Sequence, residues 1–113
     1  MKREDLLKSK EYWIVQIQND LFGVMEEFMK REKLNRTQLA GKLGVSKGYI
    51  TQIFNGDFDH KLSKLVELSL ASGKAPILHF VDVDTLVKYD KENKIYELVT
   101  MVKADPTKYS KKN

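Results

Sequence analysis

The stretch NRTQLAGKLGVSKGYITQIFNG, residues 35–56, constrains the fold more than any other part of the chain. It holds two short segments of helical character separated by Gly44. Asn35 followed by Gln38 has the spacing of a helix capping box, and Ser46 stands where a second helix needs its cap. A glycine at Gly44 permits a backbone turn that a Cβ would resist. The stretch therefore predicts two short helices joined by a tight turn.

Helical periodicity continues on both sides of this stretch. Upstream, apolar residues recur at steps of three and four between Tyr12 and Phe28, and they predict a long first helix that Ser9 caps and that ends near Lys33. Downstream, leucines on one face predict a fourth helix that Asp59 caps and that Ser72-Gly73 closes. Four helices in sequence make a compact bundle, so the main fold class is α.

Beyond Pro76 the sequence pattern changes. PILHFVDVD is rich in β-branched and aromatic residues and alternates between two faces, which predicts a β-strand. A strand needs a hydrogen-bonding partner, either KIYELVTMV at residues 94–102 or a second copy of the chain. DTLVKYDKEN between them fits a short helix or a loop. We therefore expect a bundle domain over residues 9–74, and a strand-containing extension over 75–113 that serves in dimerisation and ends in a polar tail.

Length and composition limit the remaining possibilities. A chain of 113 residues suits one bundle with attachments, and the lack of cysteine excludes disulfides and thiolate metal sites. The first residues carry charge where a signal peptide needs an apolar run, and no uncharged stretch approaches the roughly 20 residues that span a bilayer, so we expect a cytoplasmic protein with no membrane partner. Residues 35–64 hold five basic side chains against two acidic ones, a surplus that suits a polyanion such as DNA or an ordinary solvated surface.

The two short helices and their glycine turn have the sequence form of a helix-turn-helix. From about Leu34 to Gly73, the pattern LNRTQLAGKLGVSKGYITQIFNG followed by LSKLVELSLASG resembles the phage lambda repressor-like helix-turn-helix, or XRE, family of transcriptional regulators. The resemblance implies a four- to five-helix DNA-binding bundle with a long first helix. The segment after Pro76, which we expect to be a C-terminal β-strand extension, lies outside it.

The resemblance also implies which residues touch DNA. The second helix of the motif would enter the major groove with Lys47 and Gly48 first, followed by Thr51 and Gln52, while Tyr49 could read bases where Gly48 has no side chain. Arg36 stands where the family commonly has a glutamine that touches phosphate, and Asn55 and Lys61 fall at further phosphate positions. The predicted DNA-binding residues are Arg36, Gln38, Ser46, Lys47, Gly48, Tyr49, Thr51, Gln52, Asn55 and Lys61.

Other kinds of site find little support in the sequence. His60 and His79 are isolated imidazoles without metal-ligand spacing, so we expect no metal and no cofactor. No nucleophile stands beside a base, and we expect no enzymatic activity. The leading hypothesis is a sequence-specific transcriptional regulator that binds double-stranded DNA as a homodimer on a palindromic site. The alternative is an antitoxin-like interaction module that binds a partner protein through its C-terminal segment.

Overall fold

The structure is a computed structural model that describes residues 2–56, 59 and 61–105. These residues contain helices and no β-strand. The helices are α1 (Arg3–Leu7), α2 (Lys10–Glu32), α3 (Arg36–Leu43), α4 (Lys47–Asn55), α5 (Leu62–Ala71), α6 (Val83–Lys91) and α7 (Ile95–Ala104). They fall into two compact units, Lys10–Pro76 and the described residues of Met1–Ser9 with Ile77–Asn113.

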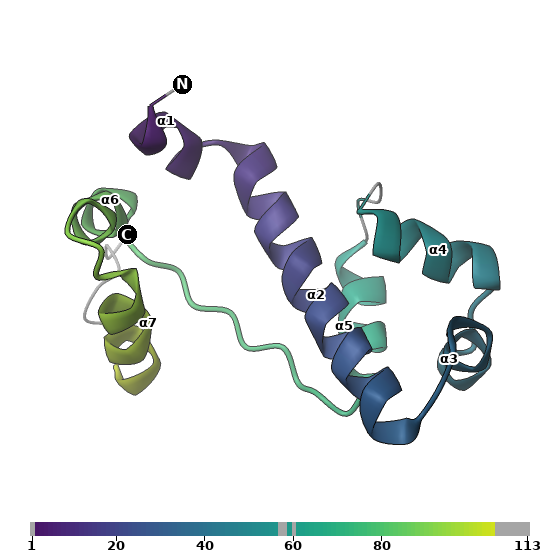
Figure 1. The fold of residues 1–113 in the computed structure, drawn as a ribbon. Coiled ribbons are helices and arrows are strands. Elements are labelled where there is room, and N and C mark those ends of the chain that lie inside the picture. The colour runs from purple at the N-terminus through teal and green to yellow at the C-terminus, as the bar shows by residue number, and fades with distance from the viewer. Residues whose placement is uncertain (1, 57–58, 60, 106–113) are drawn as a thin grey trace. The chain divides into compact units, whose positions relative to one another are not determined.

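The unit Lys10–Pro76 is the expected helical bundle. Helices α3 and α4 cross steeply beside the C-terminal half of α2, and α5 packs against both α2 and α3 (Figure 1). Their inward faces meet in one apolar core, whose buried members are Leu21, Met25, Phe28, Leu39, Ala40, Leu43, Ile50, Ile53 and Leu68. Burial of such side chains stabilises a fold by roughly 1.5–3 kcal/mol each, and here it fixes the orientation of α4.

The local signals around the turn between α3 and α4 are confirmed. The Asn35 side chain accepts a hydrogen bond from the Gln38 amide at 2.8 Å, and the Gln38 side chain accepts one from the Asn35 amide at 2.9 Å, which completes the capping box. Ser46 Oγ accepts a hydrogen bond from the Tyr49 amide at 3.0 Å. Gly44 and Gly56 end the two helices with φ of 67° and 73°, in the left-handed region that disfavours a Cβ.

One helix start differs from the prediction. Helix α5 begins at Leu62 with Lys61 at its N-cap, not at Asp59, and no side chain caps it. Helix α2 does start directly after Ser9, whose hydroxyl donates a hydrogen bond to the Leu6 carbonyl at 2.8 Å. Ser9 thus helps to end a short preceding helix, α1, which the sequence pattern did not predict.

The predicted C-terminal strand is wrong. Residues 74–82, which include PILHFVD, have no regular secondary structure, and KIYELVTMV, the proposed partner strand, lies almost wholly in α7. DTLVKYDKEN, which fitted a helix or a loop, belongs mainly to α6, with Asp82 at the N-cap. The β-branched and aromatic residues of 76–82 favour a strand locally, but a strand needs a paired neighbour, and the helical period of α7 removes the available partner.

The second unit joins the two ends of the chain. Helix α1 packs against α6, and α6 packs against α7. Among its described residues, the buried apolar side chains are Leu7, Val87, Leu98 and Val102. A unit of this size with four such side chains has a small core, so ion pairs at its surface contribute to holding α1 in place.

Candidate nucleic-acid interface

Helix α4 presents two contrasting faces. Ile50 and Ile53 are buried in the core of the bundle, with exposed fractions of 0% and 5%. The opposite face is exposed to solvent and carries no large apolar side chain. Its members are Lys47, Gly48, Thr51, Gln52 and Asn55. This face offers an ammonium group, a hydroxyl and two carboxamides, which together can donate to and accept from the edges of bases.

Two predicted contact residues also act as caps. Ser46 Oγ and the Gln38 carboxamide oxygen accept backbone hydrogen bonds at the starts of α4 and α3. Both side chains are exposed. Each cap sits among helix N-terminal amides, which carry partial positive charge and favour an approaching anion. The capping box uses the oxygen of the Gln38 carboxamide and not its nitrogen, so the nitrogen can donate to a ligand.

Arg36 lies in a stack of side chains that connects three helices. Its guanidinium carbon lies 4.5 Å from the centre of the Phe54 ring, at the end of α4. That ring in turn meets Phe22 of α2 edge-on, with centroids 4.6 Å apart. The stack packs against the guanidinium of Arg36, which is the first residue of α3 and is exposed to solvent. A planar, permanently charged guanidinium at this position can donate several hydrogen bonds to a phosphate.

Tyr49 differs from its neighbours on α4. Its ring is half-buried and packs against the bundle core, and Lys64 Nζ lies 5.5 Å from the ring centre. Burial raises the pKa of the Tyr49 phenol above its usual range, and the Glu67 carboxylate raises it further. The phenol therefore stays neutral at physiological pH. Tyr49 lies at the edge of the exposed face of α4, not within it.

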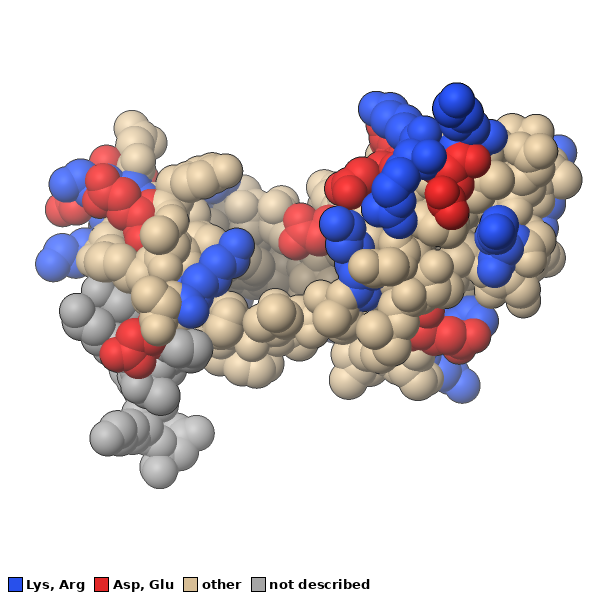
Figure 2. Space-filling model, turned by 90° about the horizontal axis from the view of Figure 1, so that it is seen from below, with Lys and Arg blue, Asp and Glu red and all other residues tan. Residues whose placement is uncertain are grey.

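Cations of the Lys10–Pro76 unit fall into two groups. On α2, Lys30 and Arg31 form ion pairs with glutamates one turn away, and Lys74 and Lys64 also pair with glutamates. Basic and acidic side chains accordingly lie side by side on the face of this unit shown in Figure 2. A second group makes no ion pair with any described acidic residue: Lys10, Lys33, Arg36, Lys42, Lys47 and Lys61.

Apart from Lys10 at the start of α2, the second group is concentrated along the sequence. No acidic residue occurs between Lys33 and Gly56, a span that contains α3 and α4. Most of the cations without a described acidic partner therefore lie in or directly before these two helices, or at Lys61 before α5. Lys42 was not among the predicted DNA-binding residues, although its charge in this acid-free span could have identified it.

Residues 26–73 match a protein-family model described as helix-turn-helix. The match spans the second half of α2 and all of α3, α4 and α5. Over this stretch the chain is similar to helix-turn-helix domains, which agrees with the lambda repressor-like XRE resemblance of the motif residues. The similarity suggests a DNA-binding regulator. The chain has no significant match among curated proteins or solved structures.

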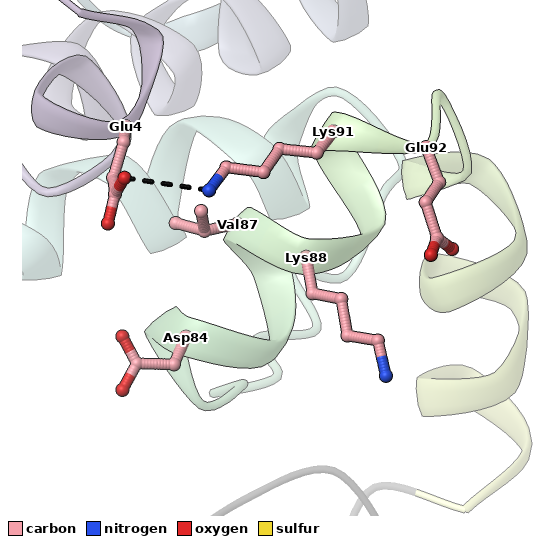
Figure 3. A pocket seen from close by; sticks show the side chains of 6 residues that line it. All are labelled: Glu4, Asp84, Val87, Lys88, Lys91 and Glu92. Atoms are coloured by element: carbon pink, nitrogen blue, oxygen red, sulfur yellow. Dashed lines mark ion pairs between the residues drawn. The ribbon is translucent and has the colours of Figure 1, made fainter.

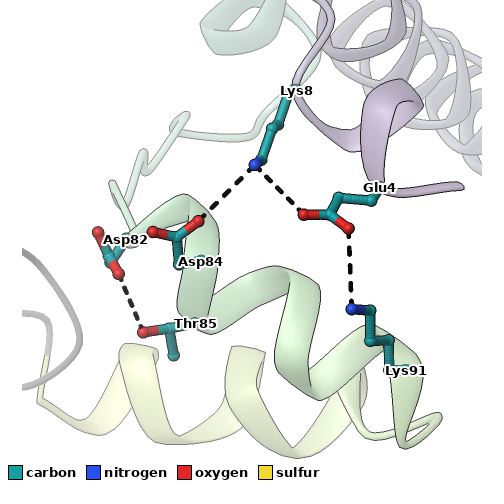
Figure 4. Close-up of polar contacts among 6 residues, drawn as sticks. All are labelled: Glu4, Lys8, Asp82, Asp84, Thr85 and Lys91. Carbon is teal, nitrogen blue, oxygen red and sulfur yellow. Dashed lines mark hydrogen bonds and ion pairs between the residues drawn. The ribbon is translucent and has the colours of Figure 1, made fainter. Parts of the chain in front are cut away.

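A hollow in the second unit is the other concave feature to consider. Its walls are charged side chains of α1 and α6, with Val87 at its base, and an ion pair between Lys91 Nζ and Glu4 Oε2 at 3.7 Å crosses it (Figure 3). Lys8 pairs with both Glu4 and Asp84, at 3.4 and 3.8 Å (Figure 4). Lys8, which hydrogen-bonds Glu4, lowers the pKa of that carboxyl, and Lys91 lowers it further. These groups are paired with one another, which suits attachment of α1 to α6.

Within residues 2–56, 59 and 61–105, no three histidine, cysteine or acidic side chains gather in a way that could hold a metal ion. His79 is half-buried in the segment before α6, and His60 lies outside the described residues. In the same part of the chain, none of the helices has the length and apolar character needed to cross a membrane.

Proposed function

We propose that the protein is a sequence-specific transcriptional regulator that inserts α4 into the major groove of double-stranded DNA. The observation that carries the proposal is the coincidence of the exposed polar face of α4 with cations that have no acidic partner among the described residues. Lys47 and Gln52 supply donors for base edges, while Arg36, Lys42 and Lys61 supply charge for phosphates. A DNA-binding regulator of this type would act in the cytoplasm.

A homodimer is part of this proposal. The helix α4 has nine residues, so one copy reads a short site with limited affinity. Two copies related by two-fold symmetry would contact half-sites roughly 34 Å apart on one face of a palindrome. Residues 75–113 are the proposed dimerisation element. Deleting them and measuring the mass in solution tests this assignment, because an unchanged dimer would move the interface to another element such as α2.

Groove reading is tested by selecting sequences from a random oligonucleotide pool and measuring their affinity by fluorescence anisotropy at two salt concentrations. We expect one palindromic sequence to be enriched, with affinity that falls steeply as salt rises. Lys47→Ala and Gln52→Ala should relax the bases that they contact. Lys88→Ala, which removes an exposed charge from α6, is the matched control and should leave the selected sequence unchanged. No enrichment with the wild-type protein would reject the proposal.

A partner protein for the C-terminal segment is the second candidate. The observation that favours it is the exposure of large apolar side chains there, with Ile77 76%, Leu78 60% and Tyr96 88% exposed. Contiguous exposed apolar surface often marks an interaction site. If the chain is antitoxin-like, the immobilised protein should retain a specific partner on an affinity column. The double substitution Ile77→Ser and Leu78→Ser should abolish this retention. A dimeric regulator would recover only copies of itself.

A further inference from the structure

Thr51 lies near the middle of the exposed face of α4, and its hydroxyl proton is already in use. Thr51 Oγ1 donates a hydrogen bond to the Lys47 carbonyl one turn earlier, at 3.2 Å. A threonine hydroxyl has one donor and two acceptor lone pairs. The side chain therefore offers a ligand its γ-methyl group and a lone pair, but no proton unless the bond within the helix is broken.

Gly48 leaves the surface beside Thr51 open. A helical side chain covers the surface over the turn that precedes its own Cα, which for Thr51 is the turn of Lys47 and Gly48. A Cβ at Gly48 would find one neighbour within 4 Å, Ser46 Oγ at 3.9 Å. The glycine is therefore not required by packing, and its missing side chain allows a short residue such as Thr51 to meet a surface that approaches α4 closely.

The groups that Thr51 offers match one kind of base pair. In the major groove, thymine presents a C5-methyl group, and its adenine partner presents the N6 amino donor. An apolar methyl and a lone pair suit these two features together, whereas guanine presents only acceptors, which would need the proton that Thr51 has already donated.

The geometry points to Thr51 as a specificity residue that recognises the C5-methyl group of a thymine, in a T·A pair of each half-site, across the gap left by Gly48. This inference rests on the proposed insertion of α4 into the major groove and names the base that one position of the helix selects. Gly48 then acts by leaving space, and Lys47 acts at this position through its backbone carbonyl.

Replacing thymine by deoxyuridine removes the methyl group and changes nothing else on the base. The experiment uses the full chain and the sequence enriched from the random pool, with each thymine replaced in turn and affinity measured by anisotropy. We expect one position per half-site at which the replacement weakens binding about threefold to fivefold, the effect of leaving one methyl group unburied. At the other thymines the replacement should have no such effect.

Two variants of matched shape assign this effect to Thr51. Thr51→Val keeps a methyl at the same place and should still discriminate thymine from deoxyuridine, whereas Thr51→Ser keeps the hydroxyl and should bind both equally. Gly48→Ala should also reduce the discrimination, because its new methyl occupies the gap. Circular dichroism establishes that each variant is folded.

The possible failures are distinguishable. If the wild type enriches no sequence, groove reading itself is rejected, and the role of Thr51 with it. If a sequence is enriched but every deoxyuridine replacement is tolerated, the protein still reads DNA and the inference about Thr51 is overturned. Discrimination that survives in Thr51→Ser would also overturn it, because another residue would then contact the methyl.

Discussion

At the scale of single residues, two exposed glycines of the motif have opposite roles. A Cβ at either position would meet no atom closer than 3.9 Å, so space does not distinguish them. Gly44 has φ of 67°, whereas Gly48 lies inside α4. Gly44→Ala should lower the free energy of unfolding by about 1–2 kcal/mol, and Gly48→Ala should raise it by about 1 kcal/mol. Thermal unfolding followed by circular dichroism measures both, and equal shifts would contradict the argument from backbone conformation.

Gly48→Ala should at the same time weaken binding to the selected DNA. A substitution that stabilises the fold and impairs binding separates the functional role of a residue from its structural role, because loss of folding cannot explain the weaker binding. Anisotropy titration of the same protein preparation supplies the comparison. Unchanged affinity would mean that DNA does not approach α4 closely at this position.

The stack of Arg36 on Phe54 leads to a second prediction at this scale. Arg36→Ala should weaken DNA binding and reduce the slope of log affinity against log salt by about 1, as expected for one lost phosphate contact. Phe54→Leu keeps an apolar side chain but removes the ring beneath the guanidinium, so it should weaken binding by a smaller factor. If the ring positions Arg36, the second substitution should have less effect in the Arg36→Ala background. Strict additivity in this double-mutant cycle would show that the ring does not position Arg36.

At the scale of helices, the sequence predicted the elements whose ends are marked by local chemistry. The cap at Ser46, the capping box at Asn35 and the left-handed glycines each act within a few residues, so their patterns identify α3 and α4 directly. The helical periodicity of the buried residues of α4 also predicted most of its exposed face. The stack under Arg36 did not, because Phe22 and Phe54 are far apart in sequence and meet only in the folded bundle.

Helix α1 and the segment 74–82 show why the other elements could not be predicted. Five residues are too few to form a helix alone, so α1 depends on the burial of Leu7 and on ion pairs to α6. The segment 74–82 has strand-forming residues, but their propensity is expressed only when a neighbouring strand is available. In both cases contacts distant in the sequence determine the outcome.

The ion pairs between α1 and α6 should make this element sensitive to pH. Lys8 and Lys91 lower the pKa of Glu4 in the folded chain. A carboxyl with a lowered pKa contributes stability above its unfolded pKa, about 4.5, and loses it as the pH falls through the folded value. The melting temperature of the wild type should therefore exceed that of Glu4→Gln slightly at pH 7, and the difference should vanish on acidification below pH 4. A difference that persists in acid would show that the carboxylate charge is not responsible.

At the scale of the whole molecule, the chain divides into units of unequal completeness. Among the described residues, the unit Lys10–Pro76 has nine buried residues in one core, whereas the second unit has four buried apolar residues and is assembled from both ends of the chain. Residues 10–76 expressed alone should therefore fold cooperatively and show the helical circular dichroism of a bundle. A peptide of residues 77–113 lacks α1 and the buried side chain of Leu7, so it should be largely unfolded.

The division into two units also predicts that DNA binding and dimerisation can be separated by truncating the chain. Residues 10–76 keep α3, α4 and the cations that have no acidic partner among the described residues, so they should still prefer the selected half-site over other DNA. If residues 75–113 hold the dimer together, this fragment should be monomeric by light scattering and should bind the full palindrome without the gain that two linked half-sites provide. A dimeric fragment with undiminished affinity would place the interface within the bundle and leave the C-terminal unit free for a protein partner.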